Sequence, residues 1–321
     1  MLIRRSRADE AISGTADASR HPPDSPARAR PTIFASDRVF KYAVITPAIF
    51  FILLIGLYPF IKLLLTSVQN ITMFQDDTSY HGFIHFERLF SDLRFWSSLA
   101  RTFAFTAVAL PVQLILGFLL ALLFVNRMPI RQVFVAVLLL PVVISPIVAG
   151  ATWRLMFEHR FGPINQIIGW FAGEEVRLLW TSDPILVWPA ILIAEVWQWT
   201  PFMFLLLLAA LSNVDREQLE AAELDGASWW MTFRWIVLPA IMPVVAIALL
   251  IRGLDLVRIF DIIWTMTRGG PGTMTESVSI YAYHMAFREF EISYSAAMAL
   301  VIIVLLTVLV VAALSRVEIS R

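Results

Sequence analysis

The sequence has 321 residues, of which 59% are hydrophobic and 16% are charged. Soluble domains are about 45–50% apolar and about 25% charged, so this composition argues against a soluble globular enzyme, and its hydrophobicity argues against a disordered chain. The 25 basic and 25 acidic side chains cancel, which gives no indication of a nucleic-acid partner. Because the chain has no cysteine, it has no disulfide, thiolate metal site or cysteine nucleophile.

The first 38 residues differ in composition from the rest. Residues 1–38 hold seven arginines and four prolines and show no apolar periodicity. Such a stretch buries too little apolar surface to fold, so we expect a disordered, cytoplasmic N-terminal tail. The first apolar run begins about 40 residues in and is too long for a cleaved signal peptide. A solvated segment that helps to set membrane orientation is the simpler interpretation, with a binding arm as the alternative.

Six long apolar segments follow, and each is long enough to cross a membrane as a helix. A spanning helix needs about 20 apolar residues, because each residue rises about 1.5 Å and the hydrocarbon core is about 30 Å thick. We therefore predict that residues 39–321 form an all-α integral membrane domain with six transmembrane helices. The predicted spans are residues 42–68, 102–125, 133–157, 185–211, 235–258 and 294–314.

Basic residues indicate which loops face the cytoplasm, because loops on that side carry an excess of Lys and Arg. Six spans put both termini on the same side of the membrane. If that side is the cytoplasm, the internal segments hold 14 basic residues and the external loops hold 7. Without the tail the counts are 6 and 7, so the predicted cytoplasmic placement of both termini depends on the tail.

The sequence lacks the motifs of nucleotide, metal and hydrolase sites. A P-loop needs Gly-Lys-Ser or Gly-Lys-Thr, but neither of the two lysines, Lys41 and Lys62, follows a glycine. His-Glu-x-x-His and Gly-x-Ser-x-Gly are also absent. His81 and His85 have ligand-like spacing, but the sequence offers no evident third ligand. We therefore predict no catalytic residue and no metal site, which argues against a membrane-embedded enzyme.

A polar segment, residues 212–234, separates the fourth and fifth spans and predicts two short helices joined at a glycine. Asp215, with Gln218 three residues later, is typical of a capped helix start. Gly226 suits the left-handed conformation just beyond a helix end, and Ser228 can cap the helix that follows. The expected result is a bent helical loop, acidic in its first arm, that protrudes from the membrane.

This segment resembles the EAA loop of ABC importer permeases. The match consists of Glu-Ala-Ala, three residues, Gly, and then Ile-x-Leu-Pro: Glu220, Ala221, Ala222, Asp225, Gly226, Ala227, Ile236, Leu238 and Pro239. Val214-Asp215 stands where the family usually has Ile-Pro, outside the docking core. The resemblance implies a type I ABC importer permease fold. It further implies that residues 212–234 are a cytoplasmic coupling helix, which docks into the ATPase through the six matching residues from Glu220 to Ala227.

Further motifs resemble the carbohydrate-uptake branch of these permeases, the maltose-type and glycerol-phosphate-type proteins. They are Trp153, Gly162-Pro163-Ile164-Asn165, Phe260-Asp261, Thr267-Arg268-Gly269-Gly270-Pro271, Thr275, Tyr281, Phe287 and Ser295-Ala296-Ala297. The family often has Gly before the last motif, where this chain has Ser293 and Tyr294. The resemblance covers roughly residues 40–314. We interpret the difference at Ser293 and Tyr294 as a local change in packing.

The resemblance implies a non-catalytic permease subunit of an importer that moves a sugar, oligosaccharide or polyol across the bacterial cytoplasmic (inner) membrane. The implied partners are a second, different permease, two ATPase subunits that bind ATP and Mg²⁺, and an extracytoplasmic solute-binding protein. No cofactor is expected in this chain. An ABC permease for an amino acid or a phosphate ester is the alternative, although the Thr-x-Gly-Gly-Pro motif argues against it. A secondary transporter, the further alternative, would not explain the Glu-Ala-Ala…Gly spacing.

The fourth predicted span combines polar and aromatic residues. Glu195, Gln198 and Phe202 recur at three- and four-residue steps, and Trp199 borders their face. A sugar site needs hydrogen-bonding side chains and aromatic platforms, and polar groups in a membrane helix usually face a cavity. The resemblance places the substrate contacts of maltose-type permeases on this helix, which makes these four residues candidates for substrate binding. Alternatively, Glu195 is interfacial and the tryptophans only anchor the helix.

The end of the fifth span carries charges at regular steps. Arg252, Asp255 and Arg258 follow one another at three-residue steps, and Asp261 comes next. Arg258 and Asp261 are further candidates for substrate binding. Arg252 and Asp255 either line the same cavity or form an ion pair that only fixes helix packing. Gly-Gly-Pro-Gly at residues 269–272 predicts a turn, which is either purely structural or a contact for the external binding protein.

Overall fold

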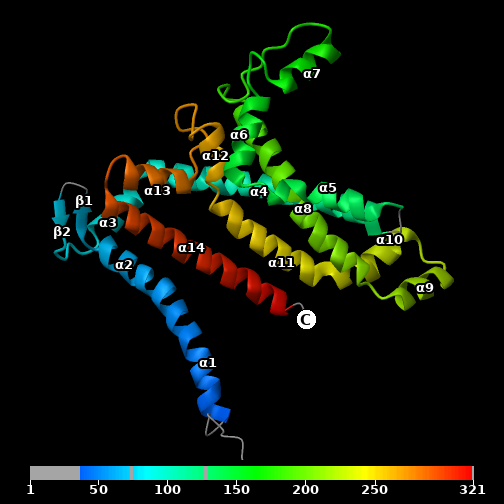
Figure 1. Ribbon diagram of the computed structural model, residues 1–321, viewed down its shortest axis with the longest axis horizontal. Coiled ribbons are helices and arrows are strands. Elements are labelled where there is room, and N and C mark those ends of the chain that lie inside the picture. The colour runs from blue at the N-terminus through cyan, green and yellow to red at the C-terminus, as the bar shows by residue number, and fades with distance from the viewer. Residues whose placement is uncertain (1–36, 73–74, 126–128, 320–321) are drawn as a thin grey trace, which may run out of the picture. The chain divides into compact units, whose positions relative to one another are not determined.

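The computed structural model describes residues 37–72, 75–125 and 129–319 (Figure 1). The predicted N-terminal tail therefore lies outside the described residues, apart from its last two, which begin the first helix. The chain divides into two compact units at Tyr58–Pro59, and each is described by itself. In the first unit, α1 (Asp37–Ile52) continues into a π-helical turn (Leu53–Leu57). Helix α2 (Tyr58–Ser67) begins at the last residue of the first unit and belongs otherwise to the second, so the predicted first span includes residues of both units.

Four long helices form the core of the second unit. They are α4 (Leu93–Val125), α8 (Val187–Ser212), α11 (Leu238–Val257) and α14 (Ile292–Ile319). The close packing of α4 on α8 requires Gly117, because a Cβ atom there would lie 2.8 Å from the backbone nitrogen of Phe204. The second, fourth, fifth and sixth predicted spans are confirmed as long apolar helices.

The third predicted span, residues 133–157, is not one straight helix. It consists of α5 (Arg131–Val143) and α6 (Pro146–Met156), which meet at an angle of 95°. Ile144 is extended, and Pro146 at the first turn of α6 has no backbone N–H to continue the ladder of α5. Among the described residues, five helices are long and apolar enough to cross a membrane, or six if this bent pair counts as one span.

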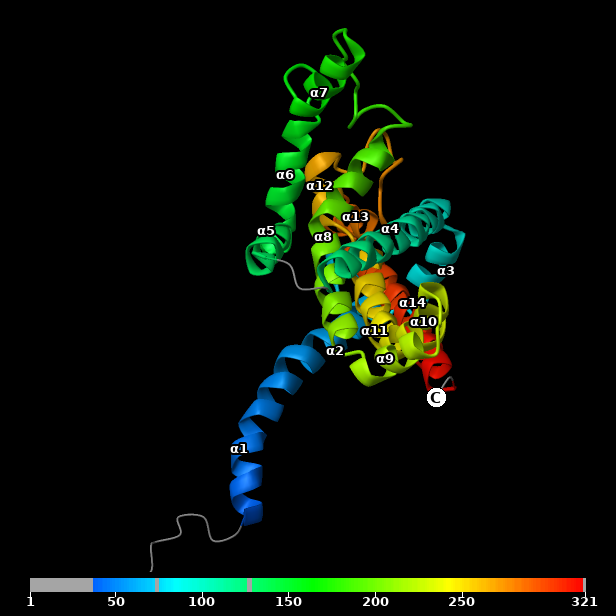
Figure 2. The same ribbon diagram turned by 90° about the vertical axis from the view of Figure 1, so that its right-hand side faces the viewer.

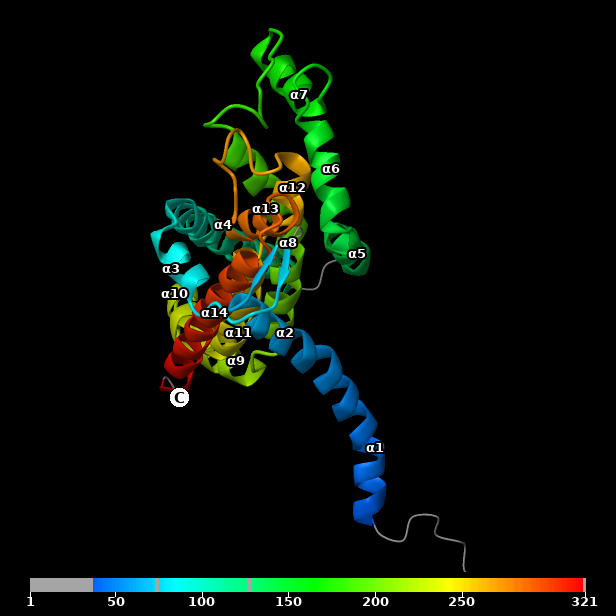
Figure 3. The same cartoon turned by 90° about the vertical axis from the view of Figure 1, so that its left-hand side faces the viewer.

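Shorter elements lie at the two ends of the long helices. At one end of α11 are α9 (Arg216–Leu224) and α10 (Trp229–Thr232), and at the other are α12 (Asp261–Met266) and α13 (Val278–Phe287) (Figure 1). The hairpin of β1 (Asn70–Thr72) and β2 (Gln75–Asp77) and helix α3 (Ile84–Ser91) lie on the side of α13. Figures 2 and 3 show that α6 and α7 (Pro163–Ala172) extend beyond the long helices.

Polar contacts fix α13 and α14 to the start of α4. The carboxylate of Asp92 accepts hydrogen bonds of 2.5 Å from the hydroxyls of both Tyr281 and Tyr294. The buried carboxylate of Glu276 accepts two more from Arg94, at 2.8 and 2.9 Å. This end of the second unit is therefore held by charge-assisted hydrogen bonds in addition to apolar packing.

Candidate functional site

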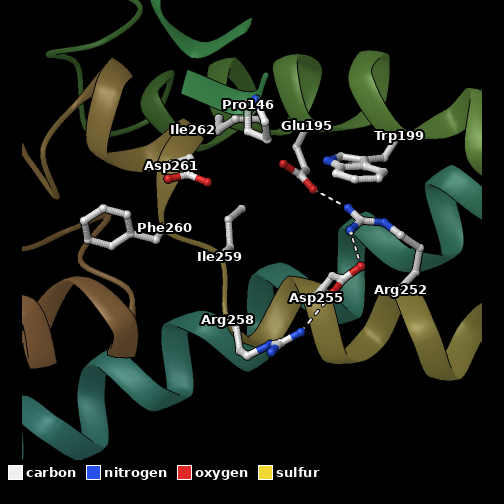
Figure 4. A pocket seen from close by; sticks show the side chains of 10 residues that line it. All are labelled: Pro146, Glu195, Trp199, Arg252, Asp255, Arg258, Ile259, Phe260, Asp261 and Ile262. Carbon is white, nitrogen blue, oxygen red and sulfur yellow. Dashed lines mark hydrogen bonds and ion pairs between the residues drawn. The ribbon is translucent and has the colours of Figure 1, made fainter. Parts of the chain in front are cut away.

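A cavity of about 340 Å³ lies where α6, α8, α11 and α12 come together. The C-terminal end of α11, the start of α12 and the break before α6 meet here and form part of the cavity wall (Figure 4). Its lining residues are Pro146, Glu195, Trp199, Arg252, Asp255, Arg258, Ile259, Phe260, Asp261 and Ile262. The cavity thus combines five charged side chains with two aromatic rings.

Helix α8 supplies one wall through two residues that are four apart. Glu195 and Trp199 lie on the same face of the helix, because residues four apart are neighbours on a helix surface. Glu195 is 3% exposed and forms an ion pair with Arg252 of α11. The ring centroid of Trp199 lies 4.3 Å from the guanidinium carbon of the same arginine. Two of the four predicted α8 residues, Glu195 and Trp199, therefore reach the cavity together with Arg252.

Arg252 is held on every side although it lies inside the bundle. Its side chain is 2% exposed, and its Nε donates a hydrogen bond of 3.1 Å to Oε1 of Gln113 in α4. Its Nη1 lies 3.6 Å from a carboxylate oxygen of Asp255. A buried ion is tolerated only when its charge is compensated and its donors are satisfied, and these contacts meet both conditions. Arg252 and Asp255 therefore form the anticipated ion pair and also line the cavity.

The charged residues Arg258 and Asp261, which follow Arg252 in the sequence, are less tightly paired than Arg252. Arg258 donates a hydrogen bond of 3.2 Å to Asp255, and its side chain is 66% exposed. Asp261 is the first residue of α12, and in the described part of the chain its carboxylate has no hydrogen bond or ion pair. Figure 4 shows Asp261 across the cavity from Arg252, next to Ile262. Two predicted residues, Arg258 and Asp261, thus line the cavity as well.

Two predicted residues have other contacts. The Nε2 of Gln198 donates a hydrogen bond of 2.9 Å to the backbone oxygen of Ile144, at the break between α5 and α6. Phe202 packs edge-to-face against Trp199, and the 6.3 Å between the two ring centroids lies within the range of about 4.5–7 Å for aromatic pairs. Neither side chain is among those that line the cavity. Gln198 fixes the bent third span, and Phe202 supports the aromatic wall from behind.

Sequence reasoning missed the contribution of α4. Gln113 is the only amide or charged residue in the predicted span 102–125, and its side chain is fully buried. Its Nε2 reaches the backbone oxygen of Glu195 at 3.4 Å, while its Oε1 accepts from Arg252. A single amide in an apolar span usually faces the bundle interior, so this signal was available in the sequence. The apolar lining residues, such as Ile259 and Phe260, gave no comparable signal.

The loop between α8 and α9 begins as the sequence predicts. The side chain of Asp215 caps α9, but it accepts from the backbone N–H of Glu217, at 3.0 Å, where a capping box would use Gln218. Gly226 follows α9 with a φ of +72°, which confirms the predicted left-handed conformation. The backbone N–H of Ala227 then donates to the oxygen of Ala222 at 2.9 Å, which closes the helix end.

The second arm of this loop differs from the prediction of a separate short helix. Ser228 caps α10 through the backbone N–H of Met231, at 3.4 Å. Helix α10 then continues without a break through a π-helical turn (Phe233–Val237) into α11. No glycine or proline stands between Ser228 and Leu238, so nothing in this stretch forces the helix to end. The second arm is therefore the first part of the fifth long helix.

A groove of about 530 Å³ lies between the two arms. Five of the six predicted coupling residues line it, and Glu220 points to solvent on the exposed side of α9. The lining residues are Gln218, Ala221, Ala222, Asp225, Gly226, Ala227, Met231 and Ile236. Small side chains on α9 and the left-handed glycine therefore shape a concave surface, whose lining includes the carboxylate of Asp225.

The Gly-Gly-Pro-Gly segment forms the predicted turn. Gly269 and Gly272 have φ angles of +90° and +59°, and the Gly270–Pro271 peptide bond is cis. The hydroxyl of Thr275 donates a hydrogen bond of 2.7 Å to the oxygen of Gly270 and lies 2.8 Å from the hydroxyl of Thr267. The turn is therefore held by hydrogen bonds inside its own loop, which supports a structural role.

The histidine pair, His81 and His85, does not converge on a common point. Nε2 of His81 lies 2.7 Å from Asp77, whereas Nε2 of His85 lies 2.9 Å from the backbone oxygen of Gln69. Within residues 37–72, 75–125 and 129–319, no three His, Asp or Glu side chains are grouped so as to hold a metal ion.

Known proteins resemble this chain over most of its length. The family described as "Binding-protein-dependent transport system inner membrane component" matches residues 89–318. The trehalose/maltose transport system permease protein MalF of Thermococcus litoralis is 35% identical over 243 residues, which cover 76% of this chain and 82% of that protein. The trehalose transport system permease protein SugA of Mycobacterium tuberculosis is 32% identical over 268 residues, which cover 83% and 85%.

A solved structure shares the fold. It is the crystal structure of a bacterial alginate ABC transporter in complex with an alginate pentasaccharide-bound periplasmic protein, and one of its chains superposes with a TM-score of 0.75. The two chains are 24% identical, and the match covers 86% of this chain and 92% of that one. The predicted all-α permease fold is thereby confirmed.

Proposed function

Since the chain belongs to the family of binding-protein-dependent transport system inner membrane components, we propose that it is one permease subunit of an ABC importer for a carbohydrate. The observation that carries the carbohydrate assignment is the cavity between α8, α11 and α12. There, hydrogen-bonding side chains and the ring of Trp199 face the same space. Saccharides offer hydroxyls and apolar ring faces, which such a lining complements.

The relatives support the same substrate class. Their names include transport of trehalose, maltose and lactose. The alternatives are a permease for an amino acid or a phosphate ester and, in another class of protein, a secondary transporter. A phosphate ester would suit a cavity with free cationic groups, whereas the buried arginine here is already occupied by carboxylates.

The groove at α9 and α10 supplies the proposed coupling surface. Ala221, Ala222, Asp225, Gly226 and Ala227 line it, and Glu220 offers an exposed carboxylate on the same helix as Ala221 and Ala222. The bent loop of α9 and α10 would enter a cleft of an ATPase partner, where a basic or amide group would pair with the carboxylate. In this proposal the groove faces the cytoplasm of a bacterial cell, as do both termini. The ATP and Mg²⁺ belong to the partner, and no cofactor is held by this chain.

The importer needs further subunits. We expect a second permease, two ATPase subunits and an extracytoplasmic solute-binding protein to complete the complex. Closure of the ATPase pair on ATP would move the groove, and the cavity would switch between outward and inward access. The six candidate substrate residues then divide into four that line the cavity, Glu195, Trp199, Arg258 and Asp261, and two that support it, Gln198 and Phe202.

Uptake into proteoliposomes tests the proposal. The full complex, with its binding protein, is supplied with ATP on the ATPase side and with labelled trehalose, maltose, lactose, histidine or glycerol 3-phosphate on the other. We expect uptake of at least one saccharide, no uptake of histidine or the phosphate ester, and none with a non-hydrolysable ATP analogue. Uptake without ATP would support a secondary transporter. Uptake of histidine or glycerol 3-phosphate alone would reject the carbohydrate assignment.

A further inference from the structure

We propose that the cavity selects its ligand by charge, accepting neutral and amino sugars and rejecting acidic sugars, and that Asp261 sets this preference. The inference rests on the proposed function, because it assumes that a saccharide enters this cavity. It names the class of saccharide from the charges that line the cavity and from the pairing of those charges.

The cavity carries more negative than positive side chains. Two arginines, Arg252 and Arg258, face three carboxylates, Glu195, Asp255 and Asp261. Glu195 is paired with Arg252, and Asp255 contacts both arginines at 3.6 and 3.2 Å. After this pairing one carboxylate, that of Asp261, remains in excess, so the lining has a formal charge of minus one.

The buried arginine is not available to an anion. Arg252 already contacts Glu195, Gln113 and Asp255, and the ring of Trp199 covers the face of its guanidinium. An acidic ligand that displaced Glu195 from this arginine, whose side chain is 2% exposed, would leave the Glu195 carboxylate buried and unpaired. Arg258, by contrast, is 66% exposed and already pairs with Asp255, and solvent screens the attraction that such an exposed charge exerts on a ligand.

The position of Asp261 is fixed by the packing of α12 on α6. Gly150 of α6 allows this approach, because a Cβ atom there would lie 1.9 Å from Oγ1 of Thr265 and 3.3 Å from Cα of Ile262. The hydroxyl of Thr265 also donates a hydrogen bond of 2.8 Å to the backbone oxygen of Asp261. The carboxylate therefore cannot leave the cavity by a movement of α12 without disrupting this contact.

An ionised carboxylate accepts hydrogen bonds and donates none. It can accept from the hydroxyls of a neutral sugar, and it binds the ammonium of an amino sugar more strongly because the hydrogen bond is charge-assisted. A uronate adds a carboxylate to a space that already holds three, where like charges repel and both arginines are already paired with carboxylates (Figure 4). The cavity thus has both an attractive and a repulsive element for the two kinds of ligand.

Three sugars that differ in one group test the inference. Glucose, glucosamine and glucuronate are titrated by ligand-observed NMR into the complete permease–ATPase complex in lipid nanodiscs, without the binding protein, at about pH 6.5, where the amine is mainly charged. The second permease is present, so any charge that it contributes is included. We expect glucosamine to bind at least as tightly as glucose. Glucuronate should bind at least tenfold more weakly than glucose, which corresponds to about 1.4 kcal/mol.

Variants assign the effect to one residue. In Asp261→Asn the difference in affinity between glucose and glucuronate should shrink to about threefold or less, or about 0.7 kcal/mol. Asp261→Glu keeps the charge and should therefore retain most of the difference in affinity. Glu174→Gln removes the same charge from an exposed loop residue outside the cavity and should change nothing.

Each remaining outcome decides against the inference. Equal binding of glucuronate and glucose by the unmodified complex would overturn the charge selection while leaving the carbohydrate function intact. If Asp261→Asn leaves the difference in affinity between glucose and glucuronate unchanged, another group sets this difference. If neither glucose nor glucosamine binds, the inference fails, and uptake of labelled saccharides shows whether the proposed function fails with it.

Discussion

Arg252 shows at the scale of a single residue how a charge is kept inside an apolar bundle. The guanidinium is 2% exposed and is compensated by Glu195 from α8, Asp255 from its own helix and the amide of Gln113 from α4. Three helices thus meet at one side chain. Removal of one partner from a buried ion pair is far more costly than removal of both, because the remaining charge is left uncompensated.

The first prediction concerns this ion pair. Arg252→Met should destabilise the protein by about 3–5 kcal/mol, because Glu195 then lies buried without its partner. The double variant Arg252→Met with Glu195→Leu should recover most of that loss, since no unpaired charge remains. The free energy of unfolding of the purified complex in detergent, from denaturant titration, measures both effects. A double variant as unstable as Arg252→Met would show that the arginine acts through its other contacts.

Asp92 gives the second prediction, on pH. Burial opposes its ionisation, but hydrogen bonds from Tyr281 and Tyr294 and from backbone N–H groups outweigh burial, so the pKa of Asp92 is lowered. A lowered folded-state pKa stabilises the folded protein above the unfolded-state pKa, and this contribution is lost as pH falls through the folded-state value. We therefore expect Asp92→Asn to lower Tm at pH 6 and to have a smaller effect at pH 3, below the ordinary pKa of an aspartate, about 3.9.

The size of this effect is limited because Asp92 is partly open to solvent, which screens its interactions. A difference in Tm between the unmodified protein and Asp92→Asn that is the same at both pH values would contradict the prediction. Tyr281→Phe provides a second check, since it removes one donor to the carboxylate and should reproduce part of the pH dependence.

At the scale of the elements, one helix connects the proposed coupling surface with the cavity. Helix α10 continues through a π-helical turn into α11, and α11 carries Arg252 and Asp255 near its other end. We therefore expect a displacement of the groove at Gly226 to be transmitted along this continuous helix to the charged lining. The sharp reversal between α9 and α10 depends on the left-handed glycine, because a side chain at that backbone position costs about 1–2 kcal/mol.

The third prediction tests this connection with two glycines of the same conformation. Gly226 and Gly173 have φ angles of +72° and +74°, and a Cβ atom at either would meet nothing within 4 Å. Gly226→Asp should abolish the stimulation of ATP hydrolysis by the loaded binding protein, whereas Gly173→Asp, with similar backbone strain at the end of α7, should retain most of it. Glu220→Ala should reduce stimulation more mildly, because one charge-assisted contact is lost. Full stimulation in Gly226→Asp would show that this loop is not the coupling element.

The whole molecule shows which features a sequence can predict. Length and hydropathy were sufficient for the long helices, because spanning a membrane constrains both. They did not reveal the 95° bend, because Ile144 and Pro146 lie within an apolar run whose average hydropathy is unaffected. The sequence also could not predict the hydrogen-bond partner of the Gln198 side chain. That partner, the backbone oxygen of Ile144, lies 54 residues away and becomes a neighbour only after the bend forms.

Orientation in the membrane is the last prediction and applies to the whole molecule. The basic residues outside the tail do not decide it, so it depends on the cytoplasmic assignment of the groove at α9. The chain has no cysteine, so one introduced thiol can be labelled without background. Glu223→Cys, on exposed α9, should resist a membrane-impermeant thiol reagent in intact cells and react after permeabilisation. Met274→Cys, which replaces a side chain that is 41% exposed at the opposite end of α11, should react in intact cells. The reverse pattern would place the groove outside the cell, where no ATPase could reach it.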